Sequence, residues 1–388
     1  MASSARFSSI GQSARTIAQA VQRGEVTATE VIRQHLAHIE ATDGQVGAFV
    51  FTRPGEALAE AGRLDDRRDL DALPLAGVPV AIKDVTDVAG HPTRHGSLGT
   101  PEVNAEHDDE TVARLRGAGA IVIGKTRCPE LSIWGVSDSA DGTARNPWNL
   151  ERTPGGSSGG SAAAVSAAMV PIAMGSDGMG SVRIPAACTG IAGIKPGSGV
   201  VPMRFGDQDE HWSGMTQYGP LATNIGDLAL MLDVLAGGRG LANAAEPDGA
   251  LRIGLSTAAA LLGTRVSKPW RNALADVGAV LASAGHRTTK QKIPASSADV
   301  MAMTTRWTSG ASTDMAVLHV ERGLVQKRTK GQARVGRAMA RMHPVRREQA
   351  EVFQAKVDAM FDDIDVLILP TLLRCPPVAQ GWQSRGWL

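Results

Sequence analysis

Short apolar runs alternate along the chain with longer stretches of helical character. The runs of strand type are Val78–Ile82, Ala120–Gly124, Pro171–Met174, Arg252–Leu255 and Val366–Leu369. The stretches of helical type are 13–41 as two amphipathic helices, 54–73, Glu110–Gly117, Ala162–Met169, 224–236, Pro269–Ala284 and most of 311–362. Thr27 with Glu30 has the capping-box pattern at the start of the second helix. Strands that alternate with helices in this way predict an α/β core with partly parallel strands.

The organisation of the chain predicts one large domain rather than two. Its 388 residues contain no internal repeat and no low-complexity linker. We therefore expect a single α/β domain over 1–388. Within it we expect N-terminal helices at 13–41, a catalytic core at about 75–240 and a helical segment at 311–362.

Composition and charge narrow the class of protein. Lys and Arg number 40 against 39 Asp and Glu, so no basic excess favours nucleic acid binding. Residues 1–12 lack the apolar segment of a secretory signal, and no apolar stretch is long enough to span a bilayer. We expect a cytoplasmic protein that binds neither nucleic acid nor membrane.

Two glycine-rich serine loops concentrate the residues that could do chemistry. They are Gly155–Ser161 and Ser176–Arg183. A phosphate-binding P-loop requires a Lys-Ser or Lys-Thr pair after its glycines, and neither loop has one. Phosphate binding is therefore the weakest interpretation of these loops.

A nucleophile elbow is the second interpretation, because Gly155–Gly159 matches the G-x-S-x-G spacing. That motif requires an apolar strand directly before it, whereas 149–154 is polar and turn-like. A triad would also need a histidine, and His286 and His343 stand in ordinary surroundings. The spacing alone therefore carries little weight.

A serine activated by lysine is the third interpretation, and it needs no histidine. Lys83 follows the apolar run Val78–Ile82, so its amine can point into the interior, where burial lowers a lysine pKa. The glycines before Ser181 let backbone N–H groups approach a ligand, as an oxyanion hole requires. From position alone, a solvated lysine at a strand end and a plain turn remain open alternatives.

The lysine and both serine loops together resemble the amidase signature family. The resemblance rests on GGSSGGSAAAVSAAMVPIAMGSDGMGSVRIPAACTGIAGIKP (Gly155–Pro196) and on LAGVPVAIKD (Leu75–Asp84). YGPLATNIGDLALMLDVLAG (Tyr218–Gly237) and DVLILPT (Asp365–Thr371) are also similar to family segments. The similarity spans nearly the whole chain.

The resemblance implies roles for individual residues. Lys83 matches the family's base, Ser157 its bridging serine in a cis peptide, and Ser181 its acylated nucleophile. The oxyanion hole would consist of the backbone N–H groups of Gly178, Met179, Gly180 and Ser181. Structural support of the loop would come from Asp177, Arg183 and Ser158.

The same resemblance implies the fold and the reaction. The fold would be a mixed, mostly parallel twisted sheet covered by helices on both faces. The reaction would be hydrolysis of a small-molecule carboxylic amide to an acid and an amine or ammonia, through an acyl-serine and without metal or organic cofactor. A homodimer is compatible with it. The alternative within the family is an amidotransferase-type subunit that delivers ammonia to a partner in a tRNA-dependent transamidase.

Two departures from the family pattern bear on activity. Met179 replaces the first of two glycines before the nucleophile, which narrows the acyl pocket, or strains the backbone where that glycine has a positive φ. Family members usually continue past Asp365–Thr371 for several further elements, and here no such tail follows. We therefore expect a C-terminally shortened fold, with a truncated, inactive homologue as a further alternative.

Overall fold

The computed structural model describes residues 7–206, 208, 210–244, 248–258 and 264–385. The chain forms two compact units, each of which is described by itself. The first comprises Met1–Asn243, Thr313–Gly331 and Pro376–Leu388, and the second comprises Ala244–Ser312 and Gln332–Cys375.

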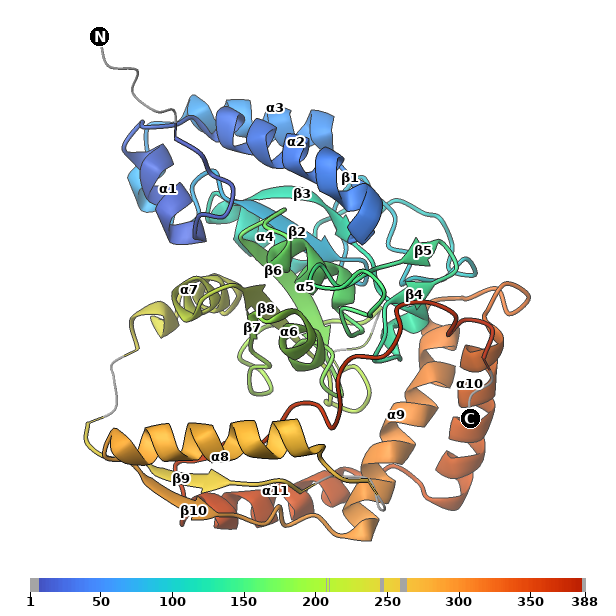
Figure 1. Cartoon of the computed structure of the whole chain (residues 1–388). Coiled ribbons are helices and arrows are strands. Elements are labelled where there is room, and N and C mark those ends of the chain that lie inside the picture. The colour runs from blue at the N-terminus through green and yellow to red at the C-terminus, as the bar shows by residue number, and fades with distance from the viewer. Residues whose placement is uncertain (1–6, 207, 209, 245–247, 259–263, 386–388) are drawn as a thin grey trace. The chain divides into compact units, whose positions relative to one another are not determined.

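A six-stranded sheet forms the centre of the first unit (Figure 1). In spatial order its strands are β1 (Phe49–Thr52), β3 (Ile121–Thr126), β2 (Pro79–Lys83), β6 (Ile172–Asp177), β8 (Gln217–Ala222) and β7 (Ala192–Gly193). The central strands β3, β2 and β6 pair in parallel, and the outer strands pair antiparallel. The register sets Lys83 opposite Thr126, and Ile82 opposite Met174, so Lys83 and the last residues of β6 reach the same edge of the sheet. Ligands of open α/β sheets bind at this carboxyl edge.

Helices surround this sheet. They are α1 (Ala14–Gln22), α2 (Ala28–Val46), α3 (Pro54–Asp65), α4 (Glu110–Gly117), α5 (Gly159–Ser166), α6 (Arg183–Thr189) and α7 (Ile225–Leu235), with short 3-10 turns η1 (Leu70–Ala72), η2 (Glu130–Ser132) and η3 (Leu241–Asn243). A small hairpin consists of β4 (Asp138–Ser139) and β5 (Gly142–Thr143). The Thr27 hydroxyl accepts the Glu30 amide at 3.1 Å, which is the helix cap that the sequence predicts. The first amides of α1, those of Ala14 and Arg15, donate to Asp227 at 2.8 and 3.1 Å.

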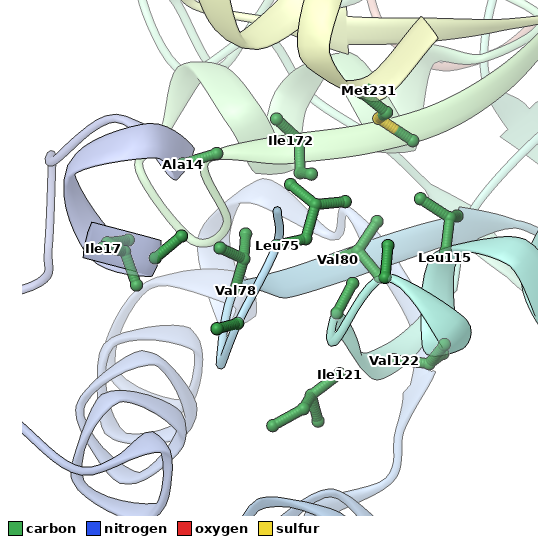
Figure 2. Packing of buried hydrophobic residues seen from close by; sticks show 14 of the residues in the cluster. Ala14, Ile17, Leu75, Val78, Val80, Leu115, Ile121, Val122, Ile172 and Met231 are labelled. Carbon is green, nitrogen blue, oxygen red and sulfur yellow. The ribbon is translucent and has the colours of Figure 1, made fainter. Parts of the chain in front are cut away.

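The sheet is buried on both faces, because alternate residues of its strands enter two different apolar clusters. Val80 and Ile172 pack on one side with Leu115 of α4 and Met231 of α7 (Figure 2). Their strand neighbours, among them Ala81, enter the other cluster, which contains the alanines of α5. The predicted α/β fold, with a mixed sheet and helices on both faces, is therefore confirmed.

The second unit has a parallel sheet of its own, in the order β10 (Arg287–Lys290), β9 (Arg252–Leu255) and β11 (Val366–Ile368). Its helices are α8 (Lys268–Ser283), α11 (Arg347–Phe361) and parts of α9 (Ser297–Val317) and α10 (Lys327–Met342). Arg252 and Asp365 join the starts of β9 and β11 through an exposed ion pair of 2.7 Å. Among the described helices, none combines the length and apolarity that a membrane crossing requires.

Candidate active site

Lys83, the last residue of β2, holds its amine inside the first unit. The strand is buried along its whole length, so the side chain has no exit to solvent. Nζ donates to Ser157 Oγ at 2.7 Å and to Ser176 Oγ at 2.9 Å. Burial lowers the pKa of Lys83 from 10.5 to about 8, although the nearby Cys128 and Asp177 oppose the shift. A lysine in this setting is a base at mildly alkaline pH.

The residue after Lys83 is also buried, and it is a carboxylate. Asp84 pairs with Lys125, whose Nζ lies 2.9 Å from Asp84 Oδ1. Among the described residues, Lys83 forms no ion pair with a carboxylate; its amine contacts serine hydroxyls instead. This absence agrees with the lowered pKa of Lys83, because an adjacent negative charge would favour the ammonium form.

Ser157 and Ser158 lie in the turn that precedes α5. The Gly156–Ser157 peptide bond is cis, as the resemblance implies. Gly156 is tightly enclosed, since a Cβ there would lie 2.6 Å from the Val136 nitrogen. Ser158 connects the two serine loops: its amide donates to Ser181 O at 3.0 Å, and its hydroxyl donates to Ser176 O at 3.2 Å. The turn therefore places the Ser157 hydroxyl against the Lys83 amine and holds the Ser181 backbone beside Ser158.

Asp177 organises the loop that follows β6. Its carboxylate accepts the amides of Gly180 at 2.6 Å and Val182 at 3.1 Å. The Arg183 guanidinium binds both carboxylate oxygens, each at 2.9 Å. Burial raises the pKa of Asp177, but Arg183 and the loop amides outweigh burial and lower it to about 2. Asp177 is therefore ionised at neutral and alkaline pH, and its hydrogen bonds hold the loop in shape.

The loop's remaining amides are the candidate oxyanion donors. The Gly180 amide donates to Asp177 at 2.6 Å. It therefore supports the loop and is not a free oxyanion donor, contrary to the role that the family resemblance implies for it. Within the described chain, the amides of Gly178, Met179 and Ser181 have no recorded hydrogen-bond partner. Met179 is not among the described non-glycine residues with positive φ, whereas Gly180 has φ of 103°. The methionine at position 179 therefore does not strain the backbone through a left-handed conformation.

Ser181 itself is half-buried. Its backbone oxygen accepts the Ser158 amide, and its hydroxyl has no hydrogen-bond partner among the residues that the structure describes. The structure thus brings Lys83 and Ser157 into direct contact and fixes the Ser181 backbone next to Ser158.

Sequence reasoning missed two parts of this site. Ser176, which accepts from Lys83, precedes Asp177 at the end of β6, and the alternation of β-strand side chains could have placed it on the same face as the base. The second part is the Trp212 ring, which covers Gly178 so closely that a Cβ there would lie 2.7 Å from a ring carbon. Trp212 Nε1 donates to the buried Asp314 carboxylate at 3.0 Å, and no local sequence signal joins residues so distant in the chain.

The other interpretations of the loops find no support in the geometry. Residues 149–154 form turns rather than the strand that a nucleophile elbow requires. His286 belongs to the second unit, where Nδ1 accepts the Leu251 amide at 3.1 Å. His343 belongs to that unit too and is exposed. Among the described residues, no group of three or more His, Cys, Asp or Glu side chains could hold a metal ion.

The chain belongs to the amidase family, which it matches over residues 30–385. It is 38% identical to "Putative amidase AmiB2" of Mycobacterium tuberculosis (strain ATCC 25618 / H37Rv), over 94% of this chain and 80% of that protein.

Two further relatives extend the comparison. The fold superposes on 6-aminohexanoate cyclic dimer hydrolase with a TM-score of 0.82 and 27% identity, over 95% of this chain and 80% of that chain. A glutamyl-tRNA(Gln) amidotransferase subunit from Chloroflexus aggregans (strain MD-66 / DSM 9485) is 43% identical, but only over 56% of this chain and 45% of its own length. The similarity to amide hydrolases therefore extends over far more of the chain than the similarity to the amidotransferase.

Proposed function

We propose that the protein hydrolyses a carboxylic amide through an acyl-enzyme on Ser181, with Lys83 as the base and Ser157 as the proton relay. One observation carries the proposal: the amine of a fully buried lysine, with its pKa lowered to about 8, lies 2.7 Å from the Ser157 hydroxyl. Such an amine loses its proton at mildly alkaline pH and then accepts the serine proton instead of donating.

The reaction begins with the neutral Lys83 amine, which takes the Ser157 proton while Ser157 takes the proton of Ser181. The Ser181 oxygen attacks the amide carbonyl and forms a tetrahedral intermediate. The proton returns through Ser157 to the leaving nitrogen, and the C–N bond breaks. Water then hydrolyses the acyl-serine by the same relay. Ser157 can serve both steps because a hydroxyl donates and accepts at once.

The negative oxygen of the intermediate is stabilised by the backbone amides of Gly178, Met179 and Ser181. Their freedom from other partners supports this role, since a donor already bonded elsewhere would not reach the oxyanion. Gly180 contributes differently, because its amide bond to Asp177 keeps the loop in shape. Trp212 packs over Gly178 and limits movement of the first donor.

The deciding experiment is to label the protein with a fluorophosphonate and map the modified peptide. We expect one label, on Ser181, together with release of ammonia or amine from an amide panel that disappears in Ser181→Ala. Both loops contain serines, so the mapped position discriminates between mechanisms. A label on Ser157, with turnover retained in Ser181→Ala, would restore the nucleophile-elbow interpretation.

A second candidate function is ammonia delivery within a tRNA-dependent transamidase, which the 43% identity over 221 residues to an amidotransferase component favours. The same chemistry at Ser181 would then release ammonia from an amide for use by a partner. Co-purification of a second protein, and ammonia release that depends on charged tRNA, would identify this function. Turnover of free amides by the isolated chain would identify the simple hydrolase.

A further inference from the structure

Lys195 lies beside the loop of candidate oxyanion donors and has no role in the proposed mechanism. It follows the edge strand β7, and the residue is half-buried. Nζ donates to Gly178 O at 3.3 Å and to Met215 O at 2.5 Å. One amine therefore joins the residue that follows β6 to the segment that leads into β8.

The backbone on both sides of this connection is held in place. The Ile194 amide donates to Pro220 O at 3.3 Å, and Gly219 faces Ile194 O so closely that a Cβ there would overlap it. Gly178 packs against the Trp212 ring, where a Cβ would lie 2.7 Å from a ring carbon. The amine therefore connects two fixed segments of the first unit.

The amine has carbonyl partners and no ion pair. Among the residues that the structure describes, its recorded partners are the oxygens of Gly178 and Met215. Burial lowers the pKa of Lys195 below its usual 10.5, and Asp177 opposes the shift but pairs with Arg183 instead. A half-buried cation without a carboxylate partner costs free energy, and costs of this kind are typical of functional positions.

The Gly178 carbonyl belongs to the same peptide group as the Met179 amide. A trans peptide group is planar, and its C=O and N–H bonds point in opposite directions. The cis bond of the described chain is Gly156–Ser157, so the Gly178–Met179 bond is trans. A donor that fixes the carbonyl on one side therefore fixes the direction of the Met179 N–H on the other. Since that N–H has no recorded partner, the contact with Lys195 is the recorded hydrogen bond that orients this peptide group.

We infer that Lys195 is a positioning residue of the oxyanion hole, which aims the Met179 amide by holding Gly178 O. The inference rests on the proposed function, in which that amide stabilises the negative oxygen of the tetrahedral intermediate. The contact also polarises the peptide group, because a hydrogen bond to C=O strengthens the N–H as a donor. Donors that are oriented in advance act on the transition state, since they need no rearrangement as charge develops.

The test measures how fast a fluorophosphonate labels Ser181 in the full chain, and it needs no known substrate. In this reaction Ser181 Oγ displaces fluoride from phosphorus, its proton leaves through Ser157, and negative charge develops on the phosphoryl oxygen. Lys195→Met removes both hydrogen bonds with a side chain of similar length. We expect its labelling rate constant to fall about tenfold to a hundredfold. Lys195→Arg keeps a cation with several N–H donors and should retain most of the rate.

Two readouts separate this role from an effect on the base or on folding. The labelling rate of Lys195→Met should still rise through about pH 8, because Lys83 is unchanged. With the amide of the panel that is turned over fastest, kcat should fall by the same factor while KM changes little, since the donor acts in the transition state. Thermal unfolding shows whether each variant is folded. Should Lys195→Met fail to fold, Lys195→Gln, with a shorter and uncharged side chain, takes its place with the same expectation.

Lys330→Met is the matched control. Lys330 also donates to a backbone carbonyl, Gly323 O at 3.2 Å, and has no recorded contact with the serine loops, so its labelling rate should not change. An unchanged rate in Lys195→Met, an equal loss in Lys330→Met or Lys195→Arg, or a shifted pH midpoint would overturn the inference alone. Absence of any label on Ser181 in the unmodified chain would overturn the proposed function and this inference with it.

Discussion

Lys125 Nζ lies 2.9 Å from Asp84 Oδ1, and the two side chains are 0% and 1% exposed. Lys125 also donates to Pro92 O at 2.9 Å and to Thr93 Oγ1 at 2.7 Å. Two lysines are thus buried at neighbouring strand ends with different partners: Lys125 has a carboxylate, and Lys83 has hydroxyls. The Asp84 carboxylate therefore pairs with Lys125, and the proposed base Lys83 has no carboxylate partner among the ion pairs of the described residues.

Removing the Lys125 cation should destabilise the protein. Lys125→Met leaves the Asp84 carboxylate buried without an opposite charge, and we expect the free energy of unfolding to fall by about 3–5 kcal/mol. Urea unfolding at pH 7 measures the loss. Adding Asp84→Asn to Lys125→Met should recover most of it. Equal losses in the single and double variants would show that the ion pair is not the cause.

Activity should rise with pH through about 8, because only the neutral Lys83 amine accepts a proton. The measurement is the pH profile of kcat/KM between pH 6 and 10 with one amide. The direction follows from burial, which disfavours the ammonium form. A profile that is flat across this interval would contradict the role of Lys83 as the base.

The buried lysine should also cost stability. Lys83 titrates near 10.5 when unfolded and near 8 when folded, so between these pH values the unfolded state binds more protons and stability rises with pH. At pH 7 the shift opposes folding by about 3 kcal/mol. We expect Lys83→Met to be inactive and more stable than the unmodified chain at pH 7, although lost hydrogen bonds to Ser157 and Ser176 offset part of the gain.

The comparison of urea midpoints at two pH values tests this prediction. The advantage of Lys83→Met should shrink between pH 7 and pH 10, since the native lysine is then neutral in the folded protein. An advantage that is independent of pH would assign the effect to packing rather than to charge.

The proposed triad should respond as one unit. Ser181→Ala should abolish turnover, and Ser157→Ala and Lys83→Ala should each lower kcat by several orders of magnitude. The double variant Ser157→Ala with Lys83→Ala should be little worse than either single one, because each removes the same proton path. A near-normal kcat in Lys83→Ala would show that Lys83 is not the base and that the proposed mechanism is wrong.

The packing of Trp212 on the loop can be tested at Gly178. Gly178→Ala places a Cβ 2.7 Å from the Trp212 ring, so either the ring or the first oxyanion donor must move. We expect kcat to fall about tenfold to a hundredfold, since displaced donors lose much of their effect. Gly62→Ala in α3 is the control, because nothing lies within 4 Å of its Cβ. An equal and small effect in both variants would show that the loop tolerates the displacement.

Sequence predicts the bounds of one strand and one helix as the structure has them. Arg252–Leu255 is predicted with the bounds that the structure gives it, and Glu110–Gly117 is the helix α4. The strand β8 was missed because Gly219 and Pro220 signal a turn, whereas pairing with β6 and β7 holds the segment extended. Each of the two compact units is assembled from segments that are distant in the sequence, so no linker composition marks where one unit gives way to the other.

The residues of the candidate site also differ in how well the sequence predicts them. Lys83, Ser157 and the loop at Ser181 stand in short motifs with recognisable spacing. Trp212 and Asp314 are 102 residues apart, and neither has a sequence context that marks it. A contact made only by tertiary folding leaves no periodicity for a single sequence to reveal.

The acceptor that caps helix α1 has a consequence for synthesis. Asp227, which accepts the Ala14 amide, stands 213 residues after it. A ribosome that adds 5–20 residues per second takes roughly 10–40 s to cover that interval. Until then the amides of Ala14 and Arg15 lack this acceptor, whereas the Thr16 amide can already bind the Ser13 hydroxyl, which accepts it at 3.0 Å. Helix α1 therefore gains its contacts with Asp227 only after more than half of the sequence shown has been synthesised.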